Sequence, residues 1–188
     1  DIPRLHQCLP KGTKVAINLA PSHLYSPSFK ADIQKLLFAL PQQDLRLVCE
    51  ITERDMLQET KANDIFTWLY QQGIEIAVDD FGTGHSALIY LEKFKLDHLK
   101  IDHGFINAIG IDTVTAPVLD SVIALAQRLK MTTVAEGVET AQQARWLIDR
   151  GVTYLQGYYF CRPLPLLQFE EWCRNPPDFR ERLIPQSA

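Results

Sequence analysis

The chain has 188 residues, of which 46% are hydrophobic and 22% charged, and its formal net charge is −4. This length and composition are typical of one globular domain with a sizeable core, and they exclude fibrous and disordered chains. The acidic balance provides no basic surface, so we expect neither a nucleic-acid polymer nor an anionic lipid surface as a partner.

Apolar strands alternate with helical segments, with no linker or low-complexity segment between them. The predicted strands cover residues 13–19, 45–51, 74–80, 96–102, 131–137 and 152–160. The predicted helices cover residues 28–40, a long segment ending near 65–73, 86–94, 115–130, 140–151 and 164–175. This alternation is typical of parallel βα units and predicts a single α/β domain.

The other sequence signals favour a reduced, intracellular chain. Its four cysteines are scattered and form no C-x-x-C pair, which argues against a disulfide framework or a zinc site. No apolar run approaches the roughly 18 residues of a membrane span, and no signal-peptide pattern is present. The five histidines share no ligand spacing, and we expect them to be exposed or structural.

Each predicted strand carries polar side chains at or near its carboxyl end. These residues are Asn18, Glu50, Asp79 with Asp80, Lys100, Glu136 and Gln156. In an α/β barrel the carboxyl ends converge on one face that carries the chemistry, whereas an open doubly wound sheet spreads them along a line. Six strands with polar groups at matching depth favour the barrel.

A converging cluster of four carboxylates needs a cation, because the charges would otherwise repel one another and take up protons. Oxygen ligands without histidine or cysteine suit Mg²⁺ or Mn²⁺. The adjacent Asp79 and Asp80 can hold two ions, one carboxylate bridging them, and such pairs stabilise the attacking and leaving oxygens in phosphodiester hydrolysis. Lys100 adds a positive charge that can orient the attacking water or the phosphate.

Simpler roles stay open for these residues. Asp79 alone would be a common helix N-cap, with Asp80 facing water, and Glu50 alone could form a buried ion pair with Lys100. Glu136 could cap the helix over residues 140–151, although Thr140 is the better placed cap.

Two further residues also have simpler alternatives. Asn18 could satisfy backbone groups before Pro21, since asparagine is a common turn residue. Gln156 could as readily pack or bond to the backbone as contact a substrate. The metal-site interpretation therefore depends on the polar residues acting together.

Six motifs occur in a fixed order: "INLAP", "CEITE", "AVDDFGTGHSAL", "LKID", "VAEGVET" and "QGYYFCRPLP". Over about residues 15–165 they closely resemble the EAL domain family of bacterial cyclic di-GMP phosphodiesterases. The resemblance implies a TIM-like (β/α)8 barrel that converts cyclic di-GMP to linear pGpG with two Mg²⁺ or Mn²⁺ ions. A catalytically silent EAL domain that binds cyclic di-GMP or a protein partner is the alternative.

The resemblance also implies roles for individual residues. Asn18, Glu50 and Asp79 would bind the first metal, and Asp79 would bridge to a second metal held also by Asp80 and Glu136. Lys100 would hold the hydrolytic water. Four further residues are expected either to contact the substrate or to support the metal ligands and the loop after "DDFG": Gln156, Glu53, Asp102 and Glu139.

The main departure from the family pattern is at the front of the chain. The Glu-Ala-Leu signature, whose Glu completes the first metal site, is absent, and six βα units are fewer than a full barrel contains. We therefore expect residues 1–188 to be roughly the C-terminal three quarters of an EAL domain that lacks its first βα elements, a segment that can be inactive on its own. The departure at His85-Ser86-Ala87 changes a loop and no ligand.

The resemblance extends to the parent protein. It implies a homodimer formed through the region after the "DDFG" motif and a sensor domain upstream. We expect a cytoplasmic domain, with any inner-membrane anchor outside these residues.

Overall fold

The computed structural model describes residues 8–40, 45–52, 59–81, 87–111, 115–179 and 183. Within these residues six strands form one parallel sheet in sequential order. The strands are β1 (Thr13–Asn18), β2 (Leu45–Thr52), β3 (Glu75–Phe81), β4 (His98–Ile101), β5 (Thr132–Ala135) and β6 (Tyr154–Leu155). A doubly wound sheet reverses its strand order at a switch point, so the sequential order supports the barrel prediction.

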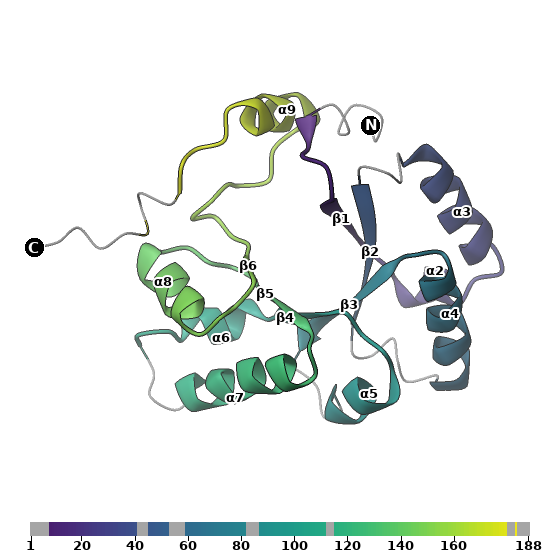
Figure 1. Cartoon of the computed structure of the whole chain (residues 1–188), viewed down its shortest axis with the longest axis horizontal. Helices are drawn as coiled ribbons and strands as arrows, with labels where there is room; N and C mark the ends of the chain where they lie inside the picture. The colour runs from purple at the N-terminus through teal and green to yellow at the C-terminus, as the bar shows by residue number, and fades with distance from the viewer. Residues whose placement is uncertain are drawn as a thin grey trace, which may run out of the picture.

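Helices follow the outer side of the curved sheet, and α9 lies beside the segment that leads into β1 (Figure 1). They are α2 (Pro21–Leu24), α3 (Phe29–Ala39), α4 (Glu59–Gln71), α5 (Ala87–Lys93), α6 (His103–Asn107), α7 (Thr115–Arg128), α8 (Ala141–Asp149) and α9 (Leu166–Arg174). Among the described residues, no helix has the length and apolar character needed to cross a membrane. The sheet and its helices form a half-barrel, a partial TIM-like fold that confirms the predicted class.

The structure corrects some of the predicted boundaries. The strand predicted over residues 152–160 is much shorter, because from Gln156 onward the chain bonds to the segment that follows β5. The predicted strand 96–102 shortens to β4. Helices α2 and α6 were not predicted, since four or five residues are too few to show a helical period.

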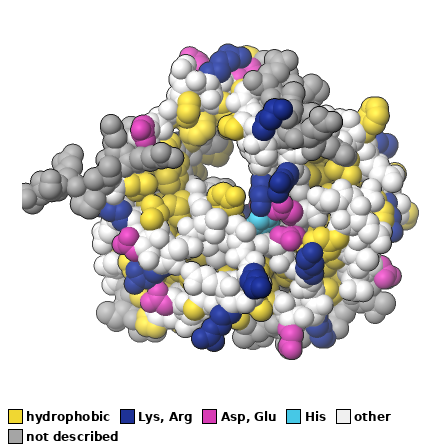
Figure 2. Space-filling model, in the orientation of Figure 1, with side chains coloured by type: hydrophobic (Ala, Val, Ile, Leu, Met, Phe, Trp, Pro, Cys, Tyr) yellow, Lys and Arg dark blue, Asp and Glu magenta, His cyan; other side chains and the backbone are white. Residues whose placement is uncertain are grey.

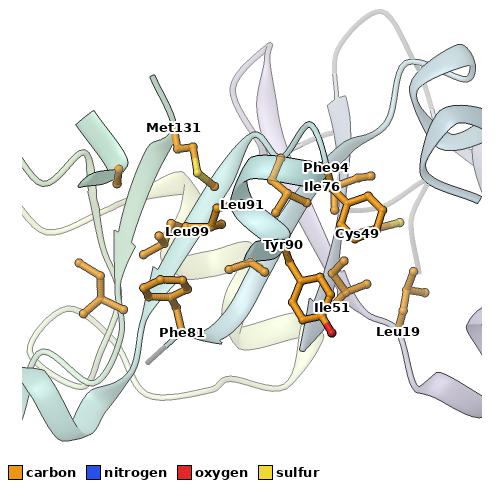
Figure 3. Close-up of a cluster of buried hydrophobic side chains, with 14 of the residues drawn as sticks. Leu19, Cys49, Ile51, Ile76, Phe81, Tyr90, Leu91, Phe94, Leu99 and Met131 are labelled. Atoms are coloured by element: carbon orange, nitrogen blue, oxygen red, sulfur yellow. The ribbon is translucent and has the colours of Figure 1, made fainter. Parts of the chain in front are cut away.

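The apolar core lies between the sheet and its helices. Outward-facing strand residues such as Ile76 and Leu99 are fully buried there against Tyr90, Leu91 and Phe94 of the α5 region (Figure 3). Successive side chains along a strand point to opposite faces of the sheet. The residues between the buried apolar ones therefore lie on the inner face, where β3 and β4 carry polar and small side chains. This alternation, apolar outside and polar inside, positions the candidate site.

Candidate metal centre

Three carboxylates from three different strands or strand ends converge on one ammonium group at the carboxyl end of the sheet. Lys100 Nζ lies 2.6 Å from Glu50 Oε2, 3.0 Å from Asp79 Oδ2 and 2.8 Å from Glu136 Oε1. The Lys100 side chain is only 6% exposed. The convergence predicted for the strand ends is therefore present for these four residues.

The electrostatics show that this cluster is short of positive charge. Burial acts against the charged form of Lys100, but its hydrogen bonds to Glu136, Glu50 and Asp79 outweigh burial and raise its pKa above the ordinary value. Burial raises the pKa of Glu136 above its usual range, and the negative charges of Asp79 and Glu50 add to this rise although Lys100 opposes it. One ammonium does not balance the carboxylates around it.

Asp80 extends the cluster on the solvent side. Its φ of 53° is in the left-handed region, and its backbone N–H donates to Asp79 Oδ1 at 2.9 Å. Ligand oxygens of Asp79, Asp80 and Glu136 all lie within 4.8 Å of one another. Left-handed backbone is uncommon at non-glycine residues, although aspartate adopts it more readily than most, and such residues are enriched at functional sites. The helix-cap alternative for Asp79 depends on residues 82–86, which lie outside the described residues.

Asn18 and Gln156 lie on the same side of the sheet as this cluster. Asn18 is exposed at the end of β1, in register with Glu50 on β2. Gln156 lines the central cavity, and its backbone N–H donates to Ala135 O at 2.8 Å.

The remaining predicted residues are separate from the cluster or cannot be placed. Asp102 is the N-cap of α6 and accepts a hydrogen bond from Gly104 N at 2.8 Å. Glu139 is exposed before α8, where Thr140 forms the capping box, so the preference for Thr140 over Glu136 as the cap is confirmed. Glu53 lies outside the described residues.

A cavity of about 390 Å³ runs along the inner face of the sheet, below this cluster. Figure 2 shows a hollow in the middle of the molecule with acidic, basic and histidine side chains beside it. Glu50, Lys100 and Gln156 line it at the carboxyl end, and Lys14 and His98 line it toward the amino end.

Sequence reasoning missed a second polar cluster at the amino end of the cavity. Glu75 Oε2 lies 2.6 Å from Lys14 Nζ and 2.5 Å from His98 Nε2. His98 is 3% exposed, and its Nδ1 has no partner among the described residues. Residues two apart on a strand lie on the same face, so the inward position of Lys100 also implies an inward His98. This spacing is the sequence signal from which the second cluster could have been predicted.

The donor set fits divalent cations. All the converging ligand atoms of Asp79, Asp80 and Glu136 are carboxylate oxygens, which suit hard cations such as Mg²⁺ and Mn²⁺. The raised pKa of Glu136 also fits a cation site, because a bound cation would stabilise the charged form of this carboxylate and lower its pKa. A half-barrel with an acidic cluster at its carboxyl ends thus defines an α/β barrel-type domain with a candidate divalent-metal centre.

Comparison with known proteins gives the family. The EAL domain matches residues 1–163, and this chain belongs to that family. It is 62% identical over 94% of its length to the probable cyclic di-GMP phosphodiesterase PdeN of Escherichia coli (strain K12), of which it covers 34%. The chain spans about a third of the length of the first curated relatives it matches.

Solved structures agree. The PaMucR phosphodiesterase in complex with c-di-GMP is 35% identical with a TM-score of 0.73, over 83% of this chain and 64% of that one. The manganese and cy-diGMP complex of BlrP1 from Klebsiella pneumoniae is 32% identical with a TM-score of 0.69, over 80% of this chain and 39% of that one.

Proposed function

We propose that this protein hydrolyses cyclic di-GMP to linear pGpG with two Mg²⁺ or Mn²⁺ ions. The observation that carries the proposal is the convergence of Glu50, Asp79 and Glu136 on Lys100, with Asp80 beside them. Relatives named as cyclic di-GMP phosphodiesterases and a related structure with manganese and cy-diGMP support it.

The assignment of ligands follows the resemblance to the EAL family and the chemistry of the side chains. Asn18, Glu50 and Asp79 would supply three ligands of one ion, whose site the family completes with the Glu that residues 1–188 do not contain. Asp79, Asp80 and Glu136 would hold the other ion. Bound divalent ions supply a nucleophilic water at neutral pH and stabilise charge on the phosphate oxygens. The amide of Asn18 is the one neutral ligand of this set.

Side chains of the protein would then orient the attacking water and the substrate. Lys100 lies between the carboxylates of both proposed sites, where its ammonium can donate to the attacking water and fix its position. Gln156, at the rim of the cavity, can donate to and accept from a substrate. We assign Asp102, the N-cap of the helix α6 that follows β4, to the surroundings of the site. We assign Glu53 and Glu139 to the surroundings of the site.

The assembly and location of the parent protein are also proposals. We propose a homodimer formed through the region after the "DDFG" motif, an upstream sensor domain, and a cytoplasmic position of this domain with any inner-membrane anchor elsewhere. Light scattering after size-exclusion chromatography checks the dimer, and a monomer at micromolar concentration contradicts it.

Chromatography of the products tests the activity directly. The purified protein is incubated with cyclic di-GMP in Mg²⁺, Mn²⁺, Ca²⁺ or excess EDTA. We expect pGpG with Mg²⁺ or Mn²⁺, and loss of activity with EDTA and with Ca²⁺, whose larger and looser shell positions water poorly. Hydrolysis that survives EDTA contradicts the proposal. Metal-dependent binding of cyclic di-GMP without turnover supports the silent alternative.

A further inference from the structure

The chain that leaves β6 is fixed to the segment that carries Glu136. Val138 N donates to Gln156 O at 3.0 Å, and Tyr159 N donates to Val138 O at 3.0 Å. Gly157 lies between these bonds, where a Cβ atom would come within 2.2 Å of Val138 O. Only glycine allows so close an approach, so the backbone on either side of Gly157 is held against the segment that carries Glu136.

That next residue, Tyr158, faces solvent while its neighbours are packed inside. Tyr159 and Phe160 contact each other and Phe179 through their rings. Tyr158 is 53% exposed, and the guanidinium carbon of Arg162 lies 4.4 Å from its ring centroid. An exposed aromatic ring with a guanidinium against one face offers a surface on which a planar group can stack.

The position of this ring relates it to the candidate metal centre. Tyr158 is two residues beyond Gln156, which lines the cavity, and it is adjacent to Tyr159, whose backbone is bonded to Val138, two residues beyond Glu136. The loops at the carboxyl ends of barrel strands are where a substrate is bound. Tyr158 therefore belongs to the loop that follows β6 at the carboxyl end of the sheet, the end that carries the candidate metal centre.

We infer that Tyr158, with Arg162 against its ring, is a specificity residue that stacks on a purine base of the substrate. This inference rests on the proposed function and deepens it, because the metal cluster recognises phosphate and cannot distinguish one base from another. Purine bases stack on tyrosine and arginine planes, and each stacked base adds substantially to binding.

The test compares a substrate that has bases with one that lacks purines. Steady-state kinetics are measured for cyclic di-GMP and for bis(p-nitrophenyl) phosphate with Tyr158→Leu, Tyr158→Phe and the surface control Phe38→Leu, whose ring is 94% exposed on α3. For Tyr158→Leu we expect KM for cyclic di-GMP to rise about tenfold, with kcat little changed, so that the preference for cyclic di-GMP falls about tenfold. Tyr158→Phe should keep the preference for cyclic di-GMP because the ring remains, and Phe38→Leu should leave this preference unchanged.

Two results overturn the inference: an unchanged preference in Tyr158→Leu, or an equal loss on both substrates. If the unaltered protein hydrolyses neither substrate, the proposed hydrolysis is contradicted. Equilibrium binding of cyclic di-GMP in Ca²⁺ then decides the role of Tyr158 separately. A Kd about tenfold weaker in Tyr158→Leu supports stacking, and an unchanged Kd, or no binding by the unaltered protein, overturns it.

Discussion

Lys100 Nζ and Glu50 Oε2 lie 2.6 Å apart although their strands, β4 and β2, are separated by β3. The contact crosses the inner, concave side of the sheet, and it also brings in Asp79 from the strand between them. An ion pair foreseen as a structural alternative to a metal site is thus part of the same cluster. The Glu50–Lys100 ion pair and the candidate metal centre therefore share the same residues, and the ammonium of Lys100 neutralises some of the carboxylate charge.

Lys100→Met separates the role of the ammonium from that of the carboxylates. We expect kcat for cyclic di-GMP to fall about 10²–10³-fold, the usual cost of removing one preorganised donor from an active site. Mn²⁺ affinity, measured by calorimetry, should stay the same or rise, because a competing cation has been removed. Loss of Mn²⁺ binding together with kcat would show instead that Lys100 only maintains the structure.

Asp79→Asn removes the charge of the proposed bridging ligand with almost no change in shape. Mn²⁺ affinity should fall more than about 100-fold, since even groups that merely orient a ligand contribute 10–100-fold, and hydrolysis should be abolished. Asp149→Asn, an exposed position at the end of α8, is the matched control and should behave like the unaltered protein. Activity of Asp79→Asn at the parent rate would disprove the two-metal assignment.

Glu75 should make the fold sensitive to acid. Burial alone would raise its pKa, but hydrogen bonds with Lys14 and His98 outweigh burial and lower the pKa below 4.5. The unfolded chain therefore takes up the proton first, and the stabilisation is fully present above about pH 4.5 and lost as pH falls through the lowered folded-state pKa.

Calorimetric unfolding of Glu75→Gln across this range checks the linkage. The difference in Tm from the unaltered protein should be largest at about pH 7 and shrink below about pH 4.5. Glu92→Gln, at an exposed position on α5, should show no such trend. A Tm difference for Glu75→Gln that is constant with pH would contradict the assignment.

Thr140 should stabilise α8 independently of the metal cluster. Its side chain accepts from Gln143 N at 3.1 Å, and the Gln143 side chain accepts from Thr140 N at 3.0 Å. Thr140→Ala should cost about 1 kcal/mol of the free energy of unfolding, measured by urea denaturation, and Thr140→Ser should cost much less. If Glu136→Gln destabilises α8 as strongly as Thr140→Ala does, the cap has been assigned to the wrong residue.

The sequence predicted the order of strands and helices and the residues at the strand ends, because the alternation of apolar segments and the polar residue that closes each strand are local signals. It did not predict the length of β6, which depends on long-range bonds from Gln156 and Val138 to partners on other segments. It treated His98 as structural or exposed, because its relation to Glu75 and Lys14 exists only once three strands are in register.

The interpretation of Asp102 shows the same limit. The structure shows Asp102 as the N-cap of α6, a helix too short to be predicted from periodicity, and the expected role of Asp102 behind the metal ligands stays a prediction. The convergence of Lys100 with the carboxylates was predicted from the strand ends, but its simultaneous contact with three of them could not be, since that depends on the curvature of the sheet.

The central claim is that the cluster around Lys100 is a divalent-metal centre, and anomalous diffraction from crystals grown with Mn²⁺ tests it most directly. The account predicts anomalous peaks at Mn²⁺-ligand distances, about 2.2 Å, from the carboxylate oxygens of Asp79, Asp80 and Glu136, with Asp79→Asn crystals as the control that lacks them. Crystals of the unaltered protein that show no anomalous peak here, with Lys100 Nζ still bonded to all three carboxylates, would contradict it.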